Sequence, residues 1–304
     1  MIFPGQGSQS VGMQSNLADN FPVVEDTYSE ASDILGYDLW NLSQTGTVDK
    51  ISETVITQPL MLTAGIAAYR VWLEEGGEQP AYLAGHSLGE YPALVAAEAI
   101  SFSDALKVVI KRSQFMQDAV PAGVGAMAAI LGLEDEKLIE ICRQASVNNV
   151  VEPVNFNSPM QVVIAGHKNA VQDAINLCQK AGAKRSILLP VSVPSHSSLM
   201  IDAGKELSDV LKSVNINTPT KKVIASSDGC PYVSEDDIRF KLSRQVHTPV
   251  QWVATIKYII GLGASNIIEC GPGKVLSGLC RRINKNICAT YIDSYDSLQK
   301  SLHG

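Results

Sequence analysis

The sequence predicts an α/β protein, with a large domain built on a mainly parallel sheet and a smaller domain inserted into it. The chain has 304 residues, which is more than one hydrophobic core usually needs. Short apolar runs alternate with helical segments before residue 123 and after residue 190, as in βαβ units. Between these positions the order of strands and helices changes, directly after the turn-forming Pro121-Ala122-Gly123.

In the first part of the chain, we expect strands at 2–3 and 81–84 and helices at 23–35, 58–73 and 103–119. Pro59 suits a first helical turn, because the N–H that proline lacks has no partner there. Ser103 is the expected N-cap of the last of these helices, since a serine hydroxyl accepts from a free N–H.

The middle of the chain predicts the order β-α-β-β-α-β, which is the ferredoxin-like arrangement. Its strands are expected at 126–131, 151–156, 161–165 and 186–189, and its helices at 134–145 and 170–181. The α/β pattern then returns, with strands at 223–225 and 266–270 and helices at 199–211 and 253–260. We therefore predict a large domain from 1–122 and 191–304, interrupted by a ferredoxin-like domain at 123–190.

Composition narrows the class of protein. The net charge of −7 argues against nucleic-acid binding, and no apolar run approaches the ~18 residues of a membrane span. The chain opens without the basic and apolar segments of a secretion signal. Its six cysteines are scattered, with no paired Cys/His spacing. We expect a cytoplasmic protein with reduced thiols and no metal site.

The pentapeptide Gly85-His86-Ser87-Leu88-Gly89 lies between an expected strand and a helix that begins at Glu90. A G-x-S-x-G sequence in this context is typical of the nucleophile elbow of α/β-hydrolase-like folds. The glycines allow a sharp turn, which exposes the serine hydroxyl. The following helix directs its N–H groups toward an oxyanion formed there. The large domain is therefore expected to be α/β-hydrolase-like, with Ser87 as its nucleophile.

A serine needs a base to take its proton. Among five histidines, His196 ends an extended run before a helix, which places it at the edge of the sheet where α/β active sites form. The alternative is a surface-loop histidine. His86 adjoins Ser87, so we expect it to point elsewhere. No Asp or Glu in a suitable loop completes a triad, although a neutral acceptor would suffice for an activated donor such as a thioester.

Two further features have open interpretations. Arg112 lies in an otherwise apolar helix, and taken alone it indicates a solvated helix face more often than a site. The loop Gly5-Gln6-Gly7-Ser8-Gln9 matches neither a P-loop nor G-x-G-x-x-G, so we expect it to bring backbone N–H groups close to a ligand.

Taken together, the segments resemble the malonyl-coenzyme A:acyl carrier protein transacylases of type II fatty acid synthesis. The similarity covers nearly the whole chain. G-x-S-x-G alone is shared with esterases and lipases, whereas the full set in this order is specific. The matching segments are Phe3-Pro4-Gly5-Gln6-Gly7-Ser8-Gln9, Thr57-Gln58-Pro59, Gly85-His86-Ser87-Leu88-Gly89-Glu90, Pro153-Val154-Asn155-Phe156-Asn157-Ser158-Pro159, Val193-Pro194-Ser195-His196, Thr248-Pro249-Val250-Gln251-Trp252 and Gly271-Pro272-Gly273-Lys274-Val275-Leu276.

The resemblance implies a role for individual residues. Ser87 matches the acylated nucleophile and His196 its base, while Gln245 falls where the family orients the histidine with a backbone carbonyl. Arg112 matches the arginine that grips the malonyl carboxylate. The backbone N–H groups of Gln6 and Leu88 would form the oxyanion hole. The residues implied to line the pocket are Asn155, Gln58 and His86.

The implied function is transfer of malonyl from malonyl-CoA to the phosphopantetheine thiol of acyl carrier protein, through a malonyl-serine. The expected partners are malonyl-CoA and acyl carrier protein, without a cofactor, nucleic acid or membrane, and the expected state is a monomer. Three alternatives remain open: a trans-acting polyketide-pathway acyltransferase, a serine esterase or thioesterase, and an inactive carrier-binding module. Arg112 discriminates against a hydrolase of neutral esters, which has no use for a buried cation.

Overall fold

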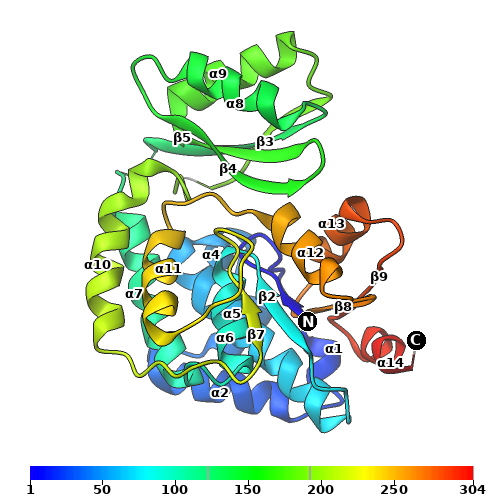
Figure 1. Ribbon diagram of the computed structural model, residues 1–304. Coiled ribbons are helices and arrows are strands. Elements are labelled where there is room, and N and C mark those ends of the chain that lie inside the picture. Colours follow the sequence, from blue (N-terminus) through cyan, green and yellow to red (C-terminus); the bar gives the residue numbers. More distant parts are fainter. Residues whose placement is uncertain (122, 192, 304) are drawn as a thin grey trace.

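The computed structural model describes residues 1–121, 123–191 and 193–303. It consists of a large unit and, at the top of Figure 1, a small unit. The small unit comprises β3 (Gly125–Leu131), α8 (Asp135–Ala145), β4 (Val151–Ser158), β5 (Gln161–His167), α9 (Lys168–Lys180) and β6 (Arg185–Leu188). The large unit comprises β1 (Ile2–Phe3), α1 (Ser15–Ala18), α2 (Val23–Leu35), α3 (Leu39–Thr45), α4 (Val48–Ser52), α5 (Thr54–Glu74), β2 (Tyr82–Gly85), η1 (Ser87–Gly89), α6 (Glu90–Ala96), α7 (Phe102–Asp118), η2 (Ser198–Met200), α10 (Ile201–Lys212), β7 (Lys222–Ile224), α11 (Glu235–Gln245), α12 (Trp252–Gly261), β8 (Asn266–Cys270), α13 (Val275–Ile283), β9 (Cys288–Ile292) and α14 (Tyr295–His303).

The sheet of the large unit has the order β7-β2-β1-β8-β9, and all its strand pairs are parallel. Its inner strands are apolar on both faces, as expected for a parallel sheet covered on both sides by helices. Phe3 pairs with Gly85, so β1 and β2 end side by side. The loop after β1 and the turn after β2 therefore meet at one edge of the sheet. The expectation of an α/β fold with a mainly parallel sheet is confirmed.

The sheet of the small unit is antiparallel, with the order β4-β5-β3-β6. Helices α8 and α9 cover the face that points away from the large unit (Figure 1). Their apolar side chains, among them Leu138, Ile141 and Ile175, pack on inward residues of the strands to form a separate core. The opposite face carries Met127, Val154 and Val163 and lies toward the large unit.

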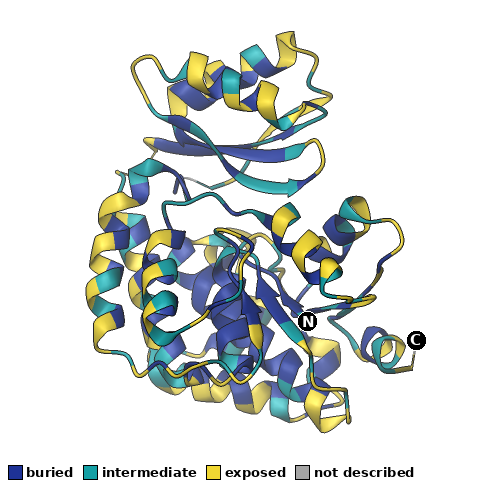
Figure 2. Ribbon diagram, viewed as in Figure 1, coloured by how far each residue is buried: buried dark blue, intermediate teal, exposed yellow. Residues whose placement is uncertain are grey.

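Helix α5 passes through the core of the large unit and is buried along nearly its whole length (Figure 2). It begins at Thr54, so the expected start at Gln58 is wrong and Pro59 lies inside the helix. An internal proline costs about 3 kcal/mol, because a helical hydrogen bond is lost. Burial of apolar side chains on all sides of this helix offsets that cost.

The N-cap of α7 is Ser101, whose hydroxyl accepts from the N–H of Asp104 at 3.0 Å. The expectation that Ser103 caps this helix is therefore wrong. Strand β9 was not expected from the sequence, and it adds a fifth strand at the edge of the parallel sheet. Across the described residues, every helix is too short or too polar to cross a bilayer.

Candidate active site

Ser87 lies at a sharp turn between β2 and α6. Its φ of +53° is in the left-handed region, which a serine rarely adopts. The turn needs both flanking glycines. A Cβ on Gly85 would lie 1.8 Å from the carbonyl carbon of Gly89, and a Cβ on Gly89 would lie 2.1 Å from the Phe3 oxygen. The sequence G-x-S-x-G therefore allows a strained turn that presents the Ser87 hydroxyl at the edge of the sheet.

The loop after β1 packs directly on this turn. The N–H of His86 donates to the Phe3 oxygen at 3.0 Å, and a Cβ on Gly5 would lie 2.5 Å from the His86 oxygen. Gly7 has a φ of +102°, and its N–H donates to the Gln9 side chain at 2.7 Å. The loop thus places Gln6 in the lining of the same cavity as Ser87.

His196 lies beside Ser87, although 109 positions separate them in the sequence. Its Nε2 is 2.8 Å from Ser87 Oγ, and its Nδ1 is 2.7 Å from the Gln245 carbonyl and 3.2 Å from that of Thr248. Because carbonyl oxygens only accept, Nδ1 carries the proton and Nε2 is free to accept one from the serine. His196 is only 3% exposed, so the interpretation as a surface-loop histidine is wrong.

The environment of His196 keeps its ring neutral. The pKa of His196 is lowered to about 3. Burial is the largest cause, and the positive charge of Arg112 is the second. The hydrogen bond to the Gln245 carbonyl acts in the opposite direction. A neutral imidazole at physiological pH can take the proton of Ser87, which is the requirement for a general base.

Arg112 is buried beside the same pair. Its Nη1 donates to Gln58 Oε1 at 2.6 Å, and its Nη2 donates to Gln245 Oε1 at 2.9 Å and to Ser87 Oγ at 3.2 Å. The guanidinium lies 5.7 Å from the centre of the Tyr91 ring. With 1% of its surface exposed, Arg112 does not lie on a solvated helix face, and that interpretation is wrong.

The acceptors around Arg112 are neutral, namely two amides and the Ser87 hydroxyl, and within the described residues its Nε has no partner. Burial lowers the pKa of Arg112, while Tyr91 and Glu90 counteract that effect. The carboxylate of Glu90 does not accept from Arg112 and accepts instead from the Ser226 N–H and from Tyr232 Oη. The arginine therefore keeps hydrogen-bonding capacity and positive charge for an anionic group beside Ser87.

Comparisons with known proteins match this geometry to a family. Residues 1–276 match the model of the acyl transferase domain. The malonyl CoA-acyl carrier protein transacylase of Escherichia coli K12 is 49% identical over 301 residues, which cover 99% of this chain and 97% of that protein. The chain belongs to the malonyl CoA-acyl carrier protein transacylase family. The Bacillus subtilis transacylase is 39% identical over 302 residues, which cover 99% of this chain and 95% of that protein.

Solved transacylase structures match the fold over almost the whole chain. The malonyl CoA-acyl carrier protein transacylase of Coxiella burnetii has a TM-score of 0.98 at 43% identity, covering 99% of this chain and 96% of its own. An acyl carrier protein S-malonyltransferase of Vibrio cholerae has a TM-score of 0.95 at 50% identity, covering 98% of both chains. A malonyl-transacylase solved in complex with its holo acyl carrier protein of a type II polyketide synthase has a TM-score of 0.98 at 47% identity, covering 99% and 98%.

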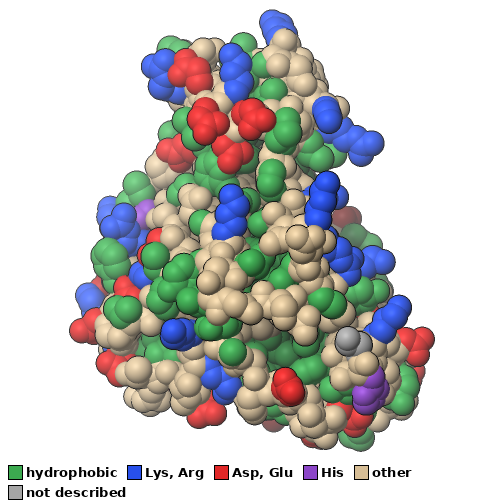
Figure 3. All heavy atoms as spheres, turned by 45° about the vertical axis from the view of Figure 1, so that its right-hand side comes forward, with side chains coloured by type: hydrophobic (Ala, Val, Ile, Leu, Met, Phe, Trp, Pro, Cys, Tyr) green, Lys and Arg blue, Asp and Glu red, His purple; other side chains and the backbone are tan. Residues whose placement is uncertain are grey.

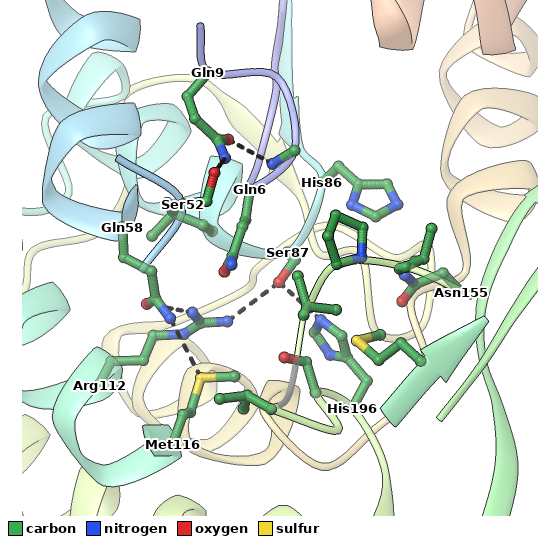
Figure 4. Close-up of a pocket in the computed structure, with 18 residues that line it drawn as sticks. Gln6, Gln9, Ser52, Gln58, His86, Ser87, Arg112, Met116, Asn155 and His196 are labelled. Atoms are coloured by element: carbon green, nitrogen blue, oxygen red, sulfur yellow. Dashed lines mark hydrogen bonds between the residues drawn. The ribbon is translucent and has the colours of Figure 1, made fainter. Parts of the chain in front are cut away.

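In this transacylase-family chain, a cavity of about 310 Å³ opens over Ser87. Figure 4 shows Arg112 and Gln58 on one side of Ser87, His196 below it, and His86 and Asn155 on the other side. Eight of the nine residues implied by the resemblance line the cavity: Gln6, Gln58, His86, Ser87, Leu88, Arg112, Asn155 and His196. Gln245 lies behind this wall and is buried, and its side-chain Nε2 donates to the Ser87 carbonyl at 2.9 Å.

Sequence reasoning missed several lining residues. Met127 comes from β3 of the small unit, Val191 from the segment after β6, and Met116 from α7, where its sulfur accepts from Gln58 at 3.6 Å. Apolar side chains in strands and helices carry no signal that separates a cavity wall from a core. Gln9 and Ser52, hydrogen-bonded at 3.4 Å, also line the cavity, and the Gly-rich loop was the available signal for Gln9.

Proposed function

We infer that this chain transfers a malonyl group from malonyl-CoA to the phosphopantetheine thiol of acyl carrier protein, and so supplies malonyl carriers for fatty acid synthesis. The single observation that carries this function is Arg112, a buried arginine held by neutral amides within 3.2 Å of the hydroxyl of Ser87. A free cation beside a serine–histidine pair suits an acyl group that ends in a carboxylate. The family membership of the chain supports the same reaction.

We propose that acylation begins when His196 Nε2 takes the proton of Ser87. The serine oxygen then attacks the thioester carbonyl, and the backbone N–H groups of Gln6 and Leu88 hold the oxyanion. As the tetrahedral intermediate collapses, the carbon–sulfur bond breaks and His196 returns its proton to the departing CoA thiolate. The product is a malonyl ester on Ser87.

In the second half-reaction, His196 deprotonates the phosphopantetheine thiol of the carrier. The thiolate attacks the malonyl ester, the carbon–oxygen bond to Ser87 breaks, and the serine recovers the proton from His196. No redox change occurs, and the proposed steps use only these side chains and backbone groups. In both halves, Gln245 and Thr248 hold the imidazole through their carbonyl groups, in place of a carboxylate.

We propose that Gln58 and Gln245 orient Arg112 without neutralising it. A carboxylate at either position would pair with the guanidinium and compete with malonyl, whereas an amide oxygen accepts a hydrogen bond and leaves the charge available. The hydrogen bond from Arg112 to Ser87 Oγ gives way when Ser87 becomes acylated. The guanidinium then pairs with the malonyl carboxylate through two parallel hydrogen bonds.

The rival functions have less support. A hydrolase of neutral esters would gain nothing from Arg112, and burial of an unpaired charge would cost it stability. An inactive carrier-binding module would not need Ser87 and His196 at hydrogen-bond distance. A trans-acting polyketide-pathway acyltransferase would use the same chemistry with another carrier. Only the identity of the carrier protein distinguishes it from a transferase of fatty acid synthesis.

The finer fold assignments remain predictions. We propose that the large unit is α/β-hydrolase-like, because a nucleophile elbow follows β2, and that the small unit is ferredoxin-like, because its strands have the order β4-β5-β3-β6. The proposed domain bounds at residues 122 and 304 lie outside the described residues. Expression of residues 123–190 alone would test the inserted domain. Sedimentation and cell fractionation would test the predicted monomer and cytoplasmic location.

We propose that the carrier docks near the cavity on a local basic surface, because the chain as a whole has a net charge of −7. Figure 3 shows lysine and arginine side chains gathered where the small unit meets the large one. The exposed basic residues concerned are Lys274, Arg281, Arg282 and Lys285 on or beside α13, and Lys184 and Arg185 before and in β6. Arg282 also donates to Gln161 of the small unit at 2.5 Å.

Intact-protein mass spectrometry tests the function. Malonyl-CoA should add one malonyl group to the protein, and acetyl-CoA should add far less. Addition of holo acyl carrier protein should move the malonyl group to the carrier, more slowly as salt rises if the basic surface guides docking. Release of free malonate without carrier acylation would instead support a thioesterase. A parallel assay with a carrier protein of a polyketide pathway distinguishes a transferase of fatty acid synthesis from one of polyketide synthesis.

The lowered pKa of His196 predicts an unusual acid limit for acylation. A general base works while neutral, so the single-turnover rate should stay level from pH 8 through pH 6.5 and fall only as pH approaches about 3. As pH falls from the ordinary histidine pKa of about 6.5 toward that lower value, the unfolded chain binds a proton that the folded protein does not, so the protein loses stability. Circular dichroism should therefore be recorded at each pH, to show that the fold is intact. An inflection in the rate at pH 6.5 or above, with the fold intact, would contradict this prediction.

A further inference from the structure

We propose that Glu152 and Asn157, both on β4 of the small unit, are positioning residues that align His196 and Ser87. The proposal rests on the proposed function of that pair. Neither residue lines the cavity. Glu152 accepts from the backbone close to His196, and Asn157 accepts from the side chain of the residue before Ser87. The small unit thus helps to align the serine and the histidine and also forms part of the cavity wall.

Glu152 holds the loop that carries His196. Its Oε2 accepts from the N–H of Ser198 at 2.7 Å, two residues after His196. Ser198 begins η2, which leads into α10, so the carboxylate satisfies a free N–H at the start of these helices. The bond runs from the small unit to the large unit and spans 46 positions of sequence.

The loop needs such support because His196 itself is strained. Its φ of +68° is in the left-handed region, and histidine has a Cβ that disfavours it. Such a conformation persists only where surrounding contacts determine it. The His196 N–H donates to the Val246 carbonyl at 2.8 Å, and Ser197 Oγ donates to the Pro194 carbonyl at 2.7 Å. Glu152 adds the hydrogen bond on the far side of the strained residue.

Asn157 holds the other member of the pair. Its Oδ1 accepts from Nε2 of His86 at 2.8 Å, and His86 directly precedes Ser87, whose φ is also positive. The His86 ring packs edge-on against Trp252, with 5.5 Å between ring centres. Burial lowers the pKa of His86, which keeps the ring neutral. Because Asn157 Oδ1 can only accept, the single ring proton lies on Nε2. The residue before the nucleophile is thus fixed from both sides.

The backbone of β4 makes a third connection to the site. The N–H of Val250 donates to Val154 at 2.8 Å, and the N–H of Phe156 donates to Val250 at 2.9 Å. Val250 lies two residues after Thr248, whose carbonyl accepts from His196. Register shifts between Pro153 and Asn155, and between Phe156 and Ser158, interrupt the pairing of β4 with β5. Such bulges redirect side chains, which here allows one strand to reach both catalytic segments.

The test measures the maximal rate of Ser87 malonylation and the apparent KM for malonyl-CoA in Glu152→Ala, Glu152→Gln and Asn157→Leu. Because small misplacements of reacting groups are costly, the alanine and leucine variants should each lower the saturated rate by roughly 10- to 100-fold and change KM by less than about threefold. Glu152→Gln keeps an acceptor oxygen and should recover to within about threefold of the parent. The control is Glu140→Ala on α8, a half-exposed site whose carboxylate accepts from Arg143 and Gln144 of the same helix, and it should act like the parent.

A phosphonofluoridate probe provides a second measurement, because it labels an activated serine without malonyl recognition. Its labelling rate should fall by the same factor as malonylation in each variant, and this arm remains valid if the malonyl function fails. The proposal is overturned if the saturated rate stays within threefold of the parent in folded Glu152→Ala and Asn157→Leu, or if Glu152→Gln is as slow as Glu152→Ala. Should Glu152→Ala not fold, Asn157→Leu and Glu152→Gln decide the outcome.

Discussion

Replacement of Ser87 by alanine will abolish the malonyl adduct, because no other described hydroxyl lies within hydrogen-bond distance of the neutral His196 ring. His196→Ala will leave the hydroxyl without a base and slow acylation by about 10²- to 10⁴-fold. Intact-protein mass spectrometry measures the adduct, and rapid quench measures the rate. These two variants have the largest expected effects, since they remove the reacting atom and the group that activates it.

The matched control for the histidine is His247→Ala, because His247 lies close in sequence to Gln245 but outside the cavity lining. It should acylate at the rate of the parent. An undiminished adduct in Ser87→Ala would show that malonyl attaches elsewhere. Parental acylation in His196→Ala would show that the 2.8 Å contact to Ser87 has no catalytic role.

Arg112→Ala will lower kcat/KM for malonyl-CoA by an amount equivalent to about 2–5 kcal/mol, the usual result of truncating one partner of a buried charge pair. A malonyl group differs from acetyl by a carboxylate, which is costly to bury without a cation. Acetyl leaves the guanidinium unpaired, so transfer from acetyl-CoA should fall less or rise. The measurement is kcat/KM for both donors.

Arg112→Lys should recover only part of the malonyl activity, because an ammonium cannot form two parallel hydrogen bonds in one plane. Lys111→Ala removes the exposed neighbouring charge on α7 and should leave both donors unaffected. An equal loss with malonyl and acetyl in Arg112→Ala would mean that the arginine supports the fold and not the choice of substrate. The esterase interpretation would then regain support.

Arg112 also shows where a correct pattern was misread. Ala105, Val109, Arg112 and Met116 recur at helical spacing, so Arg112 lies on the apolar stripe that faces the core. The sequence interpretation that considered this helix alone assigned Arg112 to a solvated face. Burial was possible because Gln58 and Gln245, from two other helices, supply acceptors, and no spacing along α7 reports them.

Features that depend on neighbouring residues could be predicted from the amino-acid sequence alone. The need for glycine at position 85 is encoded locally, because a Cβ there would clash with the backbone of Gly89, four residues later. The alternation of strands and helices likewise predicted the α/β class and the succession β-α-β-β-α-β along the middle of the chain. The predicted starts of two helices were wrong. Proline prefers a first helical turn, but the burial of α5 allows Pro59 inside the helix, and Ser101 caps α7 in place of Ser103.

The contacts that complete the site arise from the fold and could not be predicted from the sequence. His196 is oriented by the carbonyl groups of Gln245 and Thr248, and every residue has a carbonyl, so this role leaves no mark on residue type. The same holds for Glu152, whose effect depends on the Ser198 N–H that the fold brings within 2.7 Å. A turn or a cap is encoded in adjacent residues. Alignment between segments a hundred positions apart depends instead on the order of strands in the sheets and on the hydrogen bonds of β4 to the large unit.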